Sequence, residues 1–472
     1  MLSSRSNVSV RTVFTSQCRL KTAKFKQKVA KSRPLKTPSV LALDHFDFYY
    51  GPYFGKRWPS IRLGLLSPNK FIAVVNTLSK NWEAHEDILR DMGTVDLLER
   101  IRGKTAEERI EKKKRLVGKQ ASEEMTKIEE EESEEQASSS RYGSDEADLN
   151  QTASMRSSAG LGEFQRSEGT LSPGELQLGK SKEDKVDDFE IHGYESAGTK
   201  LSTRSHFIYY PRDLRVRTYD RGVLADFPGP IKTEDQPPSW WLLDGGSLVP
   251  VMALGLEKAD TLLDMCAAPG GKSLLAILTG LPDKVVCNDY KLARLGQLKR
   301  SLAMYIPPDS AEADKVVLKR KDAANISSWD EIGLYDKVLA DVPCSTDRLS
   351  VSQDEGNLFS AQLANQRLSL PQLQTKILVN AMRSVKVGGS VVYSTCTLSS
   401  MQNEGVVENS AAIAAQKFGL KFVEESLTQL NTHFTSSGLF RFSETCKRGQ
   451  LILPFVPSNF GPMYLCKLTR LL

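Results

Sequence analysis

From about residue 260 onward, short apolar runs alternate with segments of helical pattern. We expect strands in the apolar runs, at residues 261–265, 284–288, 316–318, 337–340 and 390–393. We expect helices in segments between them, such as residues 273–278 and 373–385. This alternation predicts an α/β fold with a doubly wound, mainly parallel sheet. Because ligands bind at the carboxyl ends of the strands in such a sheet, the polar and reactive residues that follow each run are the candidates for a functional site.

A tight loop joins the first predicted strand, which ends near Asp264, to the first predicted helix. The loop reads Cys266, Ala267, Ala268, Pro269, Gly270, Gly271, Lys272 and Ser273. Its glycines permit close approach of the backbone to a ligand, and the free N–H groups at the helix start suit a carboxylate or a phosphate. The spacing matches neither a dinucleotide-binding loop nor a P-loop, so an amino-acid carboxylate fits better. The alternative is a plain strand-to-helix turn.

Acidic residues follow the second and third predicted strands. Asp289 ends the second strand, where a carboxylate can accept both ribose hydroxyls of a nucleoside. Asp322 follows the third strand and could face an adenine amino group. Either residue alone could be a solvated turn residue. Together with the glycine loop they predict an adenosyl pocket, and S-adenosylmethionine combines an adenosine with an amino-acid carboxylate.

Two cysteines follow the fourth and fifth predicted strands, in Asp341-Val-Pro-Cys344-Ser and Tyr-Ser-Thr-Cys396-Thr. If these strands are neighbours, both thiols can face one substrate base. Carbon 5 of cytosine is a poor nucleophile, and a thiolate that adds to carbon 6 converts the ring into an enamine able to attack a methyl donor. Asp341 could bond the cytosine edge and supply a proton. The alternatives are inert core cysteines and an ordinary strand-end carboxylate.

The N-terminal segment is basic and the middle of the chain is acidic. Residues 1–40 carry ten Lys or Arg and no acidic residue, which is typical of a mitochondrial transit peptide, or alternatively of an RNA-binding arm. Residues 103–203 carry 15 basic and 23 acidic residues with several serine clusters, so we expect a disordered acidic linker. We expect a small N-terminal extension packed on the core at residues 41–102, and a catalytic domain at residues 204–472.

The remaining residues are only mildly basic, with 38 Lys or Arg against 35 Asp or Glu. Proteins that bind RNA unaided usually neutralise many phosphates, so we expect weak intrinsic RNA affinity and help from a partner. The seven cysteines include no Cys-x-x-Cys pair, which suggests neither a disulfide framework nor a metal site. No apolar run approaches the roughly 20 residues of a membrane span, and we expect no membrane association.

These motifs resemble the Nop/Sun-domain family of RNA cytosine-5 methyltransferases. That family carries a Cys-Ala-Ala-Pro-Gly-Gly-Lys loop, an Asp-x-Pro-Cys motif and a Thr-Cys-Thr or Thr-Cys-Ser motif, and all three occur here in order over residues 204–472. The segments 341–348, 393–399, 402–404 and 459–464 are most similar to the mitochondrial ribosomal-RNA member. The resemblance implies a Rossmann-like, S-adenosylmethionine-dependent methyltransferase fold. Most relatives have Gly after Pro-Cys-Ser, whereas this chain has Thr346, Asp347 and Arg348.

The resemblance also implies roles that the residues alone leave open. It assigns the nucleophile to Cys396 and product release to Cys344. It assigns cofactor contacts to residues 266–273 and to Asp289, Arg294, Asp322 and Asp341.

Mitochondrial ribosomal RNA is the implied substrate and the mitochondrial matrix the implied location. Precursors of the mitochondrial ribosomal subunits are implied partners, as is a guiding helical-repeat protein of the mitochondrial transcription termination factor family. Two other readings stay open. One is a ribosome-assembly subunit in which methylation is secondary. The other is a DNA cytosine methyltransferase, which is disfavoured because those enzymes use the Pro-Cys cysteine and would not need Cys396.

Overall fold

A computed structural model describes residues 36–103, 201–205, 207–234 and 236–472. The predictions for residues 1–40 and 103–203 therefore lie almost entirely outside the described residues. Within the described part, a nine-stranded sheet forms the centre of the molecule, with the order β3-β11-β13-β10-β9-β6-β7-β8 and with β12 paired to β13. Its strands are β3 (Thr203–Ser205), β6 (Thr261–Asp264), β7 (Lys284–Asn288), β8 (Val316–Lys319), β9 (Tyr335–Asp341), β10 (Val385–Thr395), β11 (Phe422–Ser426), β12 (Gln450–Ile452) and β13 (Met463–Arg470).

All five predicted strands are present as neighbours in this sheet. The pairs β10/β9, β9/β6, β6/β7 and β7/β8 are parallel, while β13 runs antiparallel to β10. The doubly wound, mainly parallel arrangement and its Rossmann-like character are therefore confirmed. Two elements were predicted too short at their N-terminal ends: the helix expected at 373–385 is α10 (Ala364–Ser384), and the strand expected at 390–393 is β10, which already begins at Val385. The register of β10 against β9 shifts between Val385 and Ser390, so the early part of this strand lacks a regular alternating pattern.

Helices cover both faces of the parallel part of the sheet. Leu262 of β6 belongs to one buried cluster, and the next residue, Leu263, belongs to another. Because successive strand residues point to opposite faces, this alternation shows that each face has its own core. The helices are α5 (Gly245–Leu254), α6 (Gly271–Ile277), α7 (Leu292–Tyr305), α8 (Ala311–Asp314), α9 (Asp347–Ser350), α10, α11 (Glu404–Phe418) and α12 (Thr428–Ser436), with a 3-10 turn at Ala361–Leu363.

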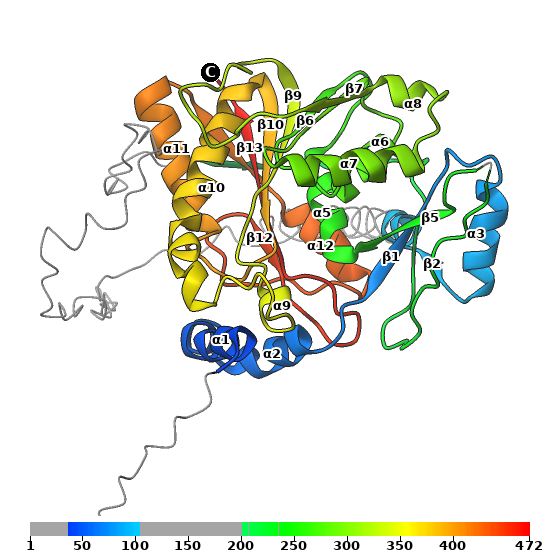
Figure 1. Ribbon diagram of the computed structural model, residues 1–472, viewed down its shortest axis with the longest axis horizontal. Coiled ribbons are helices and arrows are strands. Elements are labelled where there is room, and N and C mark those ends of the chain that lie inside the picture. Colours follow the sequence, from blue (N-terminus) through cyan, green and yellow to red (C-terminus); the bar gives the residue numbers. More distant parts are fainter. Residues whose placement is uncertain (1–35, 104–200, 206, 235) are drawn as a thin grey trace, which may run out of the picture.

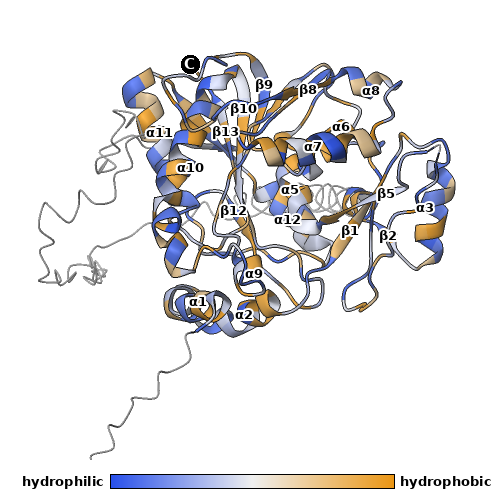
Figure 2. Ribbon diagram, viewed as in Figure 1, coloured by the Kyte–Doolittle hydropathy of each residue, from blue (hydrophilic) through white to orange (hydrophobic). Residues whose placement is uncertain are grey.

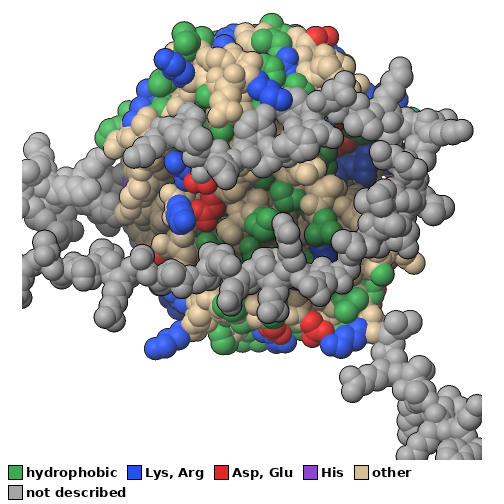
Figure 3. Space-filling model, turned by 90° about the vertical axis from the view of Figure 1, so that its left-hand side faces the viewer, with side chains coloured by type: hydrophobic (Ala, Val, Ile, Leu, Met, Phe, Trp, Pro, Cys, Tyr) green, Lys and Arg blue, Asp and Glu red, His purple; other side chains and the backbone are tan. Residues whose placement is uncertain are grey.

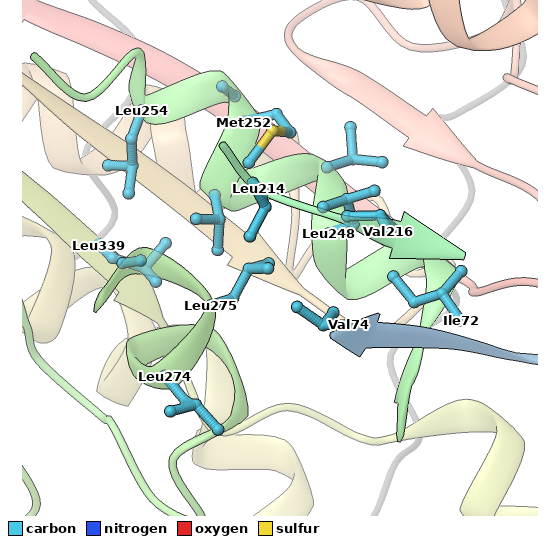
Figure 4. Close-up of a cluster of buried hydrophobic side chains, with 14 of the residues drawn as sticks. Ile72, Val74, Leu214, Val216, Leu248, Met252, Leu254, Leu274, Leu275 and Leu339 are labelled. Carbon is cyan, nitrogen blue, oxygen red and sulfur yellow. The ribbon is translucent and has the colours of Figure 1, made fainter. Parts of the chain in front are cut away.

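The first of these clusters surrounds α5, all of whose residues are buried. Figure 4 shows Leu248 and Met252 of α5 among side chains from α6, from β9 and from a second, smaller sheet. A helix that is apolar on every side is expected in such a position. The outer helices α3 (Trp82–Asp91) and α10 instead carry both hydrophilic and hydrophobic residues (Figure 2).

The second sheet is antiparallel, with the order β2-β4-β1-β5. Its strands β1 (Phe71–Val75) and β2 (Val95–Asp96) come from the N-terminal piece, whereas β4 (Val216–Thr218) and β5 (Trp240–Asp244) come from the region that we assigned to the catalytic domain. The division at residue 204 stays a prediction, but strand pairing crosses it. Asp244 ends β5 and caps α5 by accepting a hydrogen bond from the Gly246 N–H, so the second sheet leads directly into the core.

The N-terminal helices α1 (Pro38–Phe54) and α2 (Trp58–Leu66) lie beside α9 (Figure 1), joined to each other by a 3-10 turn at Gly55–Arg57. The buried face of α1 consists of Ala42, Phe46, Tyr50 and Phe54, spaced four residues apart. These side chains share a cluster with Phe359 and with residues of β9 and β10. Among the described residues, no helix combines the length and apolar character needed to cross a membrane.

Candidate active site

A cavity of about 500 Å³ opens at the carboxyl ends of the parallel strands. It is lined by residues that follow β6, β7, β8, β9 and β10, together with side chains of α10. Most of the predicted site residues line it, namely Cys266, Ala268, Pro269, Lys272, Asp289, Arg294, Asp322, Asp341, Cys344 and Cys396. Ala267, Gly270, Gly271 and Ser273 belong to the same loop but do not line this cavity.

The glycine loop is held from beneath by a buried hydrogen bond. The Ser273 hydroxyl donates to Asp264 Oδ2 at 2.6 Å, and both side chains are almost completely buried. Burial raises the pKa of Asp264 to about 7, with the Asp341 carboxylate adding to the effect and the Ser273 hydroxyl opposing it. Ser273 therefore supports the loop instead of facing the cavity.

The two glycines have a packing role in addition to the ligand approach that we expected. Gly270 has φ +116°, and a Cβ there would lie 3.0 Å from Leu298 Cδ1. At Gly271 a Cβ would lie 3.0 Å from Leu243 Cδ1. A side chain at either position would therefore require the neighbouring leucine tip to shift, and at Gly270 it would also adopt an unfavourable backbone conformation.

Polar side chains connect the ends of β6, β7 and β8. Asp289 Oδ1 accepts from the Lys291 N–H at 3.0 Å, and Asp289 Oδ2 lies 3.3 Å from Arg294 Nε. Arg294 Nη2 also donates to the Ala268 carbonyl at 2.5 Å, which links α7 to the glycine loop. Asp322 Oδ1 accepts from the Ala324 N–H at 2.9 Å. These carboxylates, with the adjoining small apolar residues, suit the hydroxyls and the ring of an adenosyl group.

Asn288 is a cavity residue that our sequence reasoning missed. Its Nδ2 donates to the carbonyls of Met265 and Lys321, each at 3.0 Å, and its Oδ1 accepts from the Lys321 N–H at 2.8 Å. It thus fixes three strand ends relative to one another. Its position directly before Asp289, at the end of a predicted strand, was the available signal.

The two cysteines lie together, as expected from neighbouring strands. Cys344 Sγ and Cys396 Sγ are 3.0 Å apart, and the Cys396 N–H donates to Cys344 Sγ at 3.3 Å. Both are free thiols; Cys344 is buried and Cys396 is partly exposed. The register of β9 against β10 pairs Asp341 with Ser394. The loops that carry Cys344 and Cys396 therefore leave the sheet side by side at the same edge.

Asp341 and Lys272 form an ion pair beside the thiols. Asp341 Oδ2 lies 2.8 Å from Lys272 Nζ, and Asp341 Oδ1 accepts from the Ser394 hydroxyl at 2.7 Å. Burial lowers the pKa of Lys272, but the attraction of the Asp341 carboxylate outweighs burial, so the net shift of the pKa is upward. Lys272 is therefore a cation whose charge acts on Cys396.

The hydrogen bond to Cys344 is the largest cause that raises the pKa of the Cys396 thiol well above its usual value. Burial and the Asp341 carboxylate raise this pKa further, while the Lys272 ammonium lowers it. The thiol form of Cys396 is therefore favoured beside Cys344, and a nucleophilic thiolate at Cys396 requires loss of a proton.

Two glutamines outside the predicted set hold the Pro-Cys loop. Gln374 Nε2 donates to the Pro343 carbonyl at 2.8 Å and to Gln402 Oε1 at 3.0 Å. Gln402 Oε1 also accepts from the Ser345 N–H at 3.1 Å. Gln374 lies on α10, and Gln402 lies just before α11. No local sequence pattern marked Gln374, because its hydrogen-bonding partners are more than 25 residues away in the sequence.

Comparison with known proteins identifies the family. A family profile described as "16S rRNA methyltransferase RsmB/F" matches residues 251–437. The chain is 61% identical to "5-cytosine rRNA methyltransferase nsun-4" of Caenorhabditis elegans over 98% of both chains. It is 31% identical to "5-cytosine rRNA methyltransferase NSUN4" of Mus musculus over 95% of this chain and 93% of the relative.

A third relative aligns over a shorter region. The chain is 35% identical to "tRNA (cytosine(34)-C(5))-methyltransferase, mitochondrial" of Danio rerio over 52% of this chain and 66% of that protein. The matched family region contains the glycine loop and both cysteine motifs. The chain therefore belongs to the RsmB/F, or Nop/Sun, family of S-adenosylmethionine-dependent RNA cytosine-5 methyltransferases.

Proposed function

We propose that this protein methylates carbon 5 of a cytosine in mitochondrial ribosomal RNA through a covalent adduct with Cys396. The observation that carries the proposal is the 3.0 Å separation of Cys344 Sγ and Cys396 Sγ at the edge of a cavity suited to an adenosyl group. The names of the two full-length relatives support ribosomal RNA as the substrate. Cytosine-5 chemistry needs a nucleophile for carbon 6 and a means of releasing the product, and two adjacent thiols can supply both.

Residues at the ends of β6, β7 and β8 would hold S-adenosylmethionine. Asp289 is available for the ribose hydroxyls, Asp322 for the adenine amino group, and the loop 266–273 with Arg294 for the amino-acid end. When bound, the cofactor supplies the electrophilic methyl group. Asp289 and Arg294 already have hydrogen-bonding partners in the protein, which fix their orientation before a ligand enters.

Cys396 would act as the nucleophile. Its thiol gives up its proton to solvent water, and the sulfur forms a bond with carbon 6 of the cytosine while the electrons of the C5–C6 double bond become available at carbon 5 to attack the methyl group. The Lys272 ammonium favours the thiolate, and Asp341, fixed by Lys272 and Ser394, bonds the polar edge of the base. After methylation, loss of the carbon 5 proton and cleavage of the C6–S bond restore the aromatic ring. Cys344 lies close enough to Cys396 to assist this last step.

We place this activity in the mitochondrial matrix, acting on precursors of the ribosomal subunit. The basic, acid-free segment 1–40 supports import. On the face of the molecule in Figure 3, basic and acidic side chains are interspersed, and residues outside 1–40 and 103–203 are only mildly basic. A partner that brings the enzyme to RNA is therefore part of the proposal, and a helical-repeat protein of the mitochondrial transcription termination factor family is the candidate.

Bisulfite sequencing of mitochondrial RNA from depleted cells tests the substrate. We expect at least one ribosomal cytosine to lose its protection, and re-expression of the wild-type protein, but not Cys396→Ala, to restore it. Loss of protection in transfer RNA alone would reject ribosomal RNA as the substrate. Failure of subunit assembly with unchanged cytosine protection would instead favour a ribosome-assembly subunit whose methylation is secondary.

A further inference from the structure

We propose that Asp347 is a positioning residue that holds the two cysteine loops together and joins them to helix α1. The inference rests on the proposed function, because it concerns the geometry of the two thiols. Asp347 is the first residue of α9, three positions after Cys344, and its side chain is completely buried. It does not line the cavity, so it would act through its neighbours and not by touching the substrate.

Each oxygen of Asp347 bonds to the loop that carries Cys396. Oδ1 accepts from the Thr397 hydroxyl at 2.8 Å, and Oδ2 accepts from the Leu398 N–H at 2.8 Å. Oδ1 also accepts from the Ser345 hydroxyl at 2.7 Å. Ser345 and Thr397 directly follow the two cysteines, and their hydroxyl oxygens are 2.8 Å apart. One carboxylate therefore connects the residue after each reactive cysteine.

The remaining hydrogen bond to the Asp347 carboxylate comes from the N-terminal extension. Tyr50, on the buried face of α1, donates its hydroxyl to Asp347 Oδ2 at 2.8 Å. The next residue, Arg348, donates Nη1 to the carbonyls of Gly64 and Ser67 at the end of α2, each at 2.9 Å. Neighbouring side chains of α9 thus attach both helices of the extension to the catalytic loops.

The partners of this site favour a carboxylate. An ionised Asp accepts hydrogen bonds at both oxygens and donates none, which matches a site where three hydroxyls and one N–H converge. An Asn could keep an oxygen for the Leu398 N–H, but its NH2 group would force the facing hydroxyls to accept instead of donate, and the negative charge that strengthens these hydrogen bonds would be lost. The preceding residue, Thr346, has φ +46°, an unfavourable conformation for a β-branched residue that persists only where its surroundings hold it. The turn after Cys344 is therefore held in place by its surroundings, and Asp347 is the polar residue at its centre.

Asp347→Asn tests the role, with Tyr50→Phe as a partial variant. Tyr53→Phe is the matched control, because Tyr53 lies one turn away on α1 and donates to Glu404 Oε1 instead of the cysteine loops. At saturating RNA and cofactor, Asp347→Asn should slow methyl transfer by at least tenfold. A displacement of a reacting group by about 1 Å can cost roughly a hundredfold in rate, which sets the upper end of the expected effect. Tyr50→Phe should slow it by about threefold to tenfold, as expected for one lost hydrogen bond.

The KM values for RNA and cofactor should change by less than about twofold in these variants, since Asp347 does not line the cavity, and Tyr53→Phe should match the wild type. A folded Asp347→Asn protein with a wild-type rate, or with only a raised KM, would overturn the proposal. If Asp347→Asn does not fold, Thr397→Val and Thr397→Ser replace it. The Ser variant keeps the hydroxyl and should recover the rate that the Val variant loses, and equal rates would overturn the proposal.

A second measurement does not depend on activity. Phenylarsine oxide reacts with two adjacent thiols and forms two As–S bonds. Its oxygen leaves as water together with the two thiol protons. The wild-type protein should bind it through Cys344 and Cys396, Cys344→Ser should not form this bridge, and Asp347→Asn should bind at least tenfold more weakly. Unchanged affinity in Asp347→Asn would overturn the proposal. If Asp347→Asn binds phenylarsine oxide more weakly but the wild-type protein methylates no RNA, the positioning role would be supported and the proposed function would be rejected.

Discussion

At the scale of single residues, the thiol pair depends on how Cys344 alters Cys396. The hydrogen bond between the sulfurs is the largest cause of the raised pKa of Cys396, ahead of burial. Lys272 opposes the shift but is itself paired with Asp341, so its cation is partly neutralised at the site. Cys344 therefore favours the thiol form of Cys396, in addition to the release step that we propose for it.

We expect Cys344→Ala to lower the pKa of Cys396. The substitution removes the acceptor that stabilises the thiol form, while Lys272 continues to favour the thiolate. At each pH between 6 and 10, iodoacetamide should alkylate Cys396 faster in Cys344→Ala than in the wild type, as mass spectrometry of the Cys396 peptide can measure. Cys446 is a slow-reacting internal reference, because it lies outside the cavity lining and burial raises its pKa to about 12, so its alkylation should be the same in both proteins. Equal alkylation rates of Cys396 in the two proteins would mean that Cys344 does not control its protonation.

At the scale of elements, the loop between β6 and α6 brings Gly270 against helix α7 and Gly271 against strand β5. Gly270 has a positive φ and lies close to Leu298 of α7. Arg294 lies on the same helix, one turn before Leu298. The backbone of Gly270 thus sets the distance between the loop and α7. A change at this glycine should disturb both stability and the cavity.

Gly270→Ala should destabilise the fold by about 1–2 kcal/mol, because alanine is strained at φ +116°. The nearby Leu298 side chain would also have to shift. Gly296→Ala, in the middle of α7, is the matched control, since the nearest atom to its added Cβ is a flexible arginine end at 3.6 Å. That control should gain up to about 1 kcal/mol. Denaturant titration measures the free energy of unfolding of both variants. Equal effects of the two substitutions would contradict the prediction, because they would show that the loop at Gly270 tolerates a side chain.

Sequence patterns predicted the parallel strands and the position of the cavity, because each apolar run ends at a residue with reactive or polar chemistry. Cys344 and Cys396 were expected to lie together for that reason, and they do. The second sheet was not predicted, since β1 pairs with β4 and β5 across residues 104–200 and long-range pairing leaves no local pattern. Asp347 was quoted only as a departure from the family motif. Its partners Tyr50 and Thr397 are distant in sequence, so its role emerges only in the folded chain.

At the scale of the whole molecule, the extension and the catalytic core are joined by polar contacts as well as by a shared core. Strands β4 and β5 pair with β1, and α1 reaches Asp347 through Tyr50. The same joined structure carries little net positive charge outside residues 1–40 and 103–203. Few phosphates can then be neutralised by the folded enzyme alone.

A protein lacking residues 1–40 should bind RNA weakly, and its affinity should fall only slowly with salt. A slope below about 3 in a plot of log affinity against log salt corresponds to about four phosphate contacts on a single strand. The full-length chain, with ten additional basic residues, is the control and should show a steeper slope. Fluorescence anisotropy across a salt series measures both. Tight and steeply salt-dependent binding by the shortened protein would remove the need for a guiding partner.

A denaturing gel of wild type, Cys396→Ala and Cys344→Ala, each with its RNA and S-adenosylmethionine, tests the central claim most directly. Cys396→Ala should transfer no methyl group and form no protein–RNA band, because no bond to carbon 6 can form. Cys344→Ala should transfer the methyl group but stall before release, so a denaturation-resistant band should accumulate above the wild-type level. A band from Cys396→Ala with none from Cys344→Ala would reverse the two roles and contradict the account.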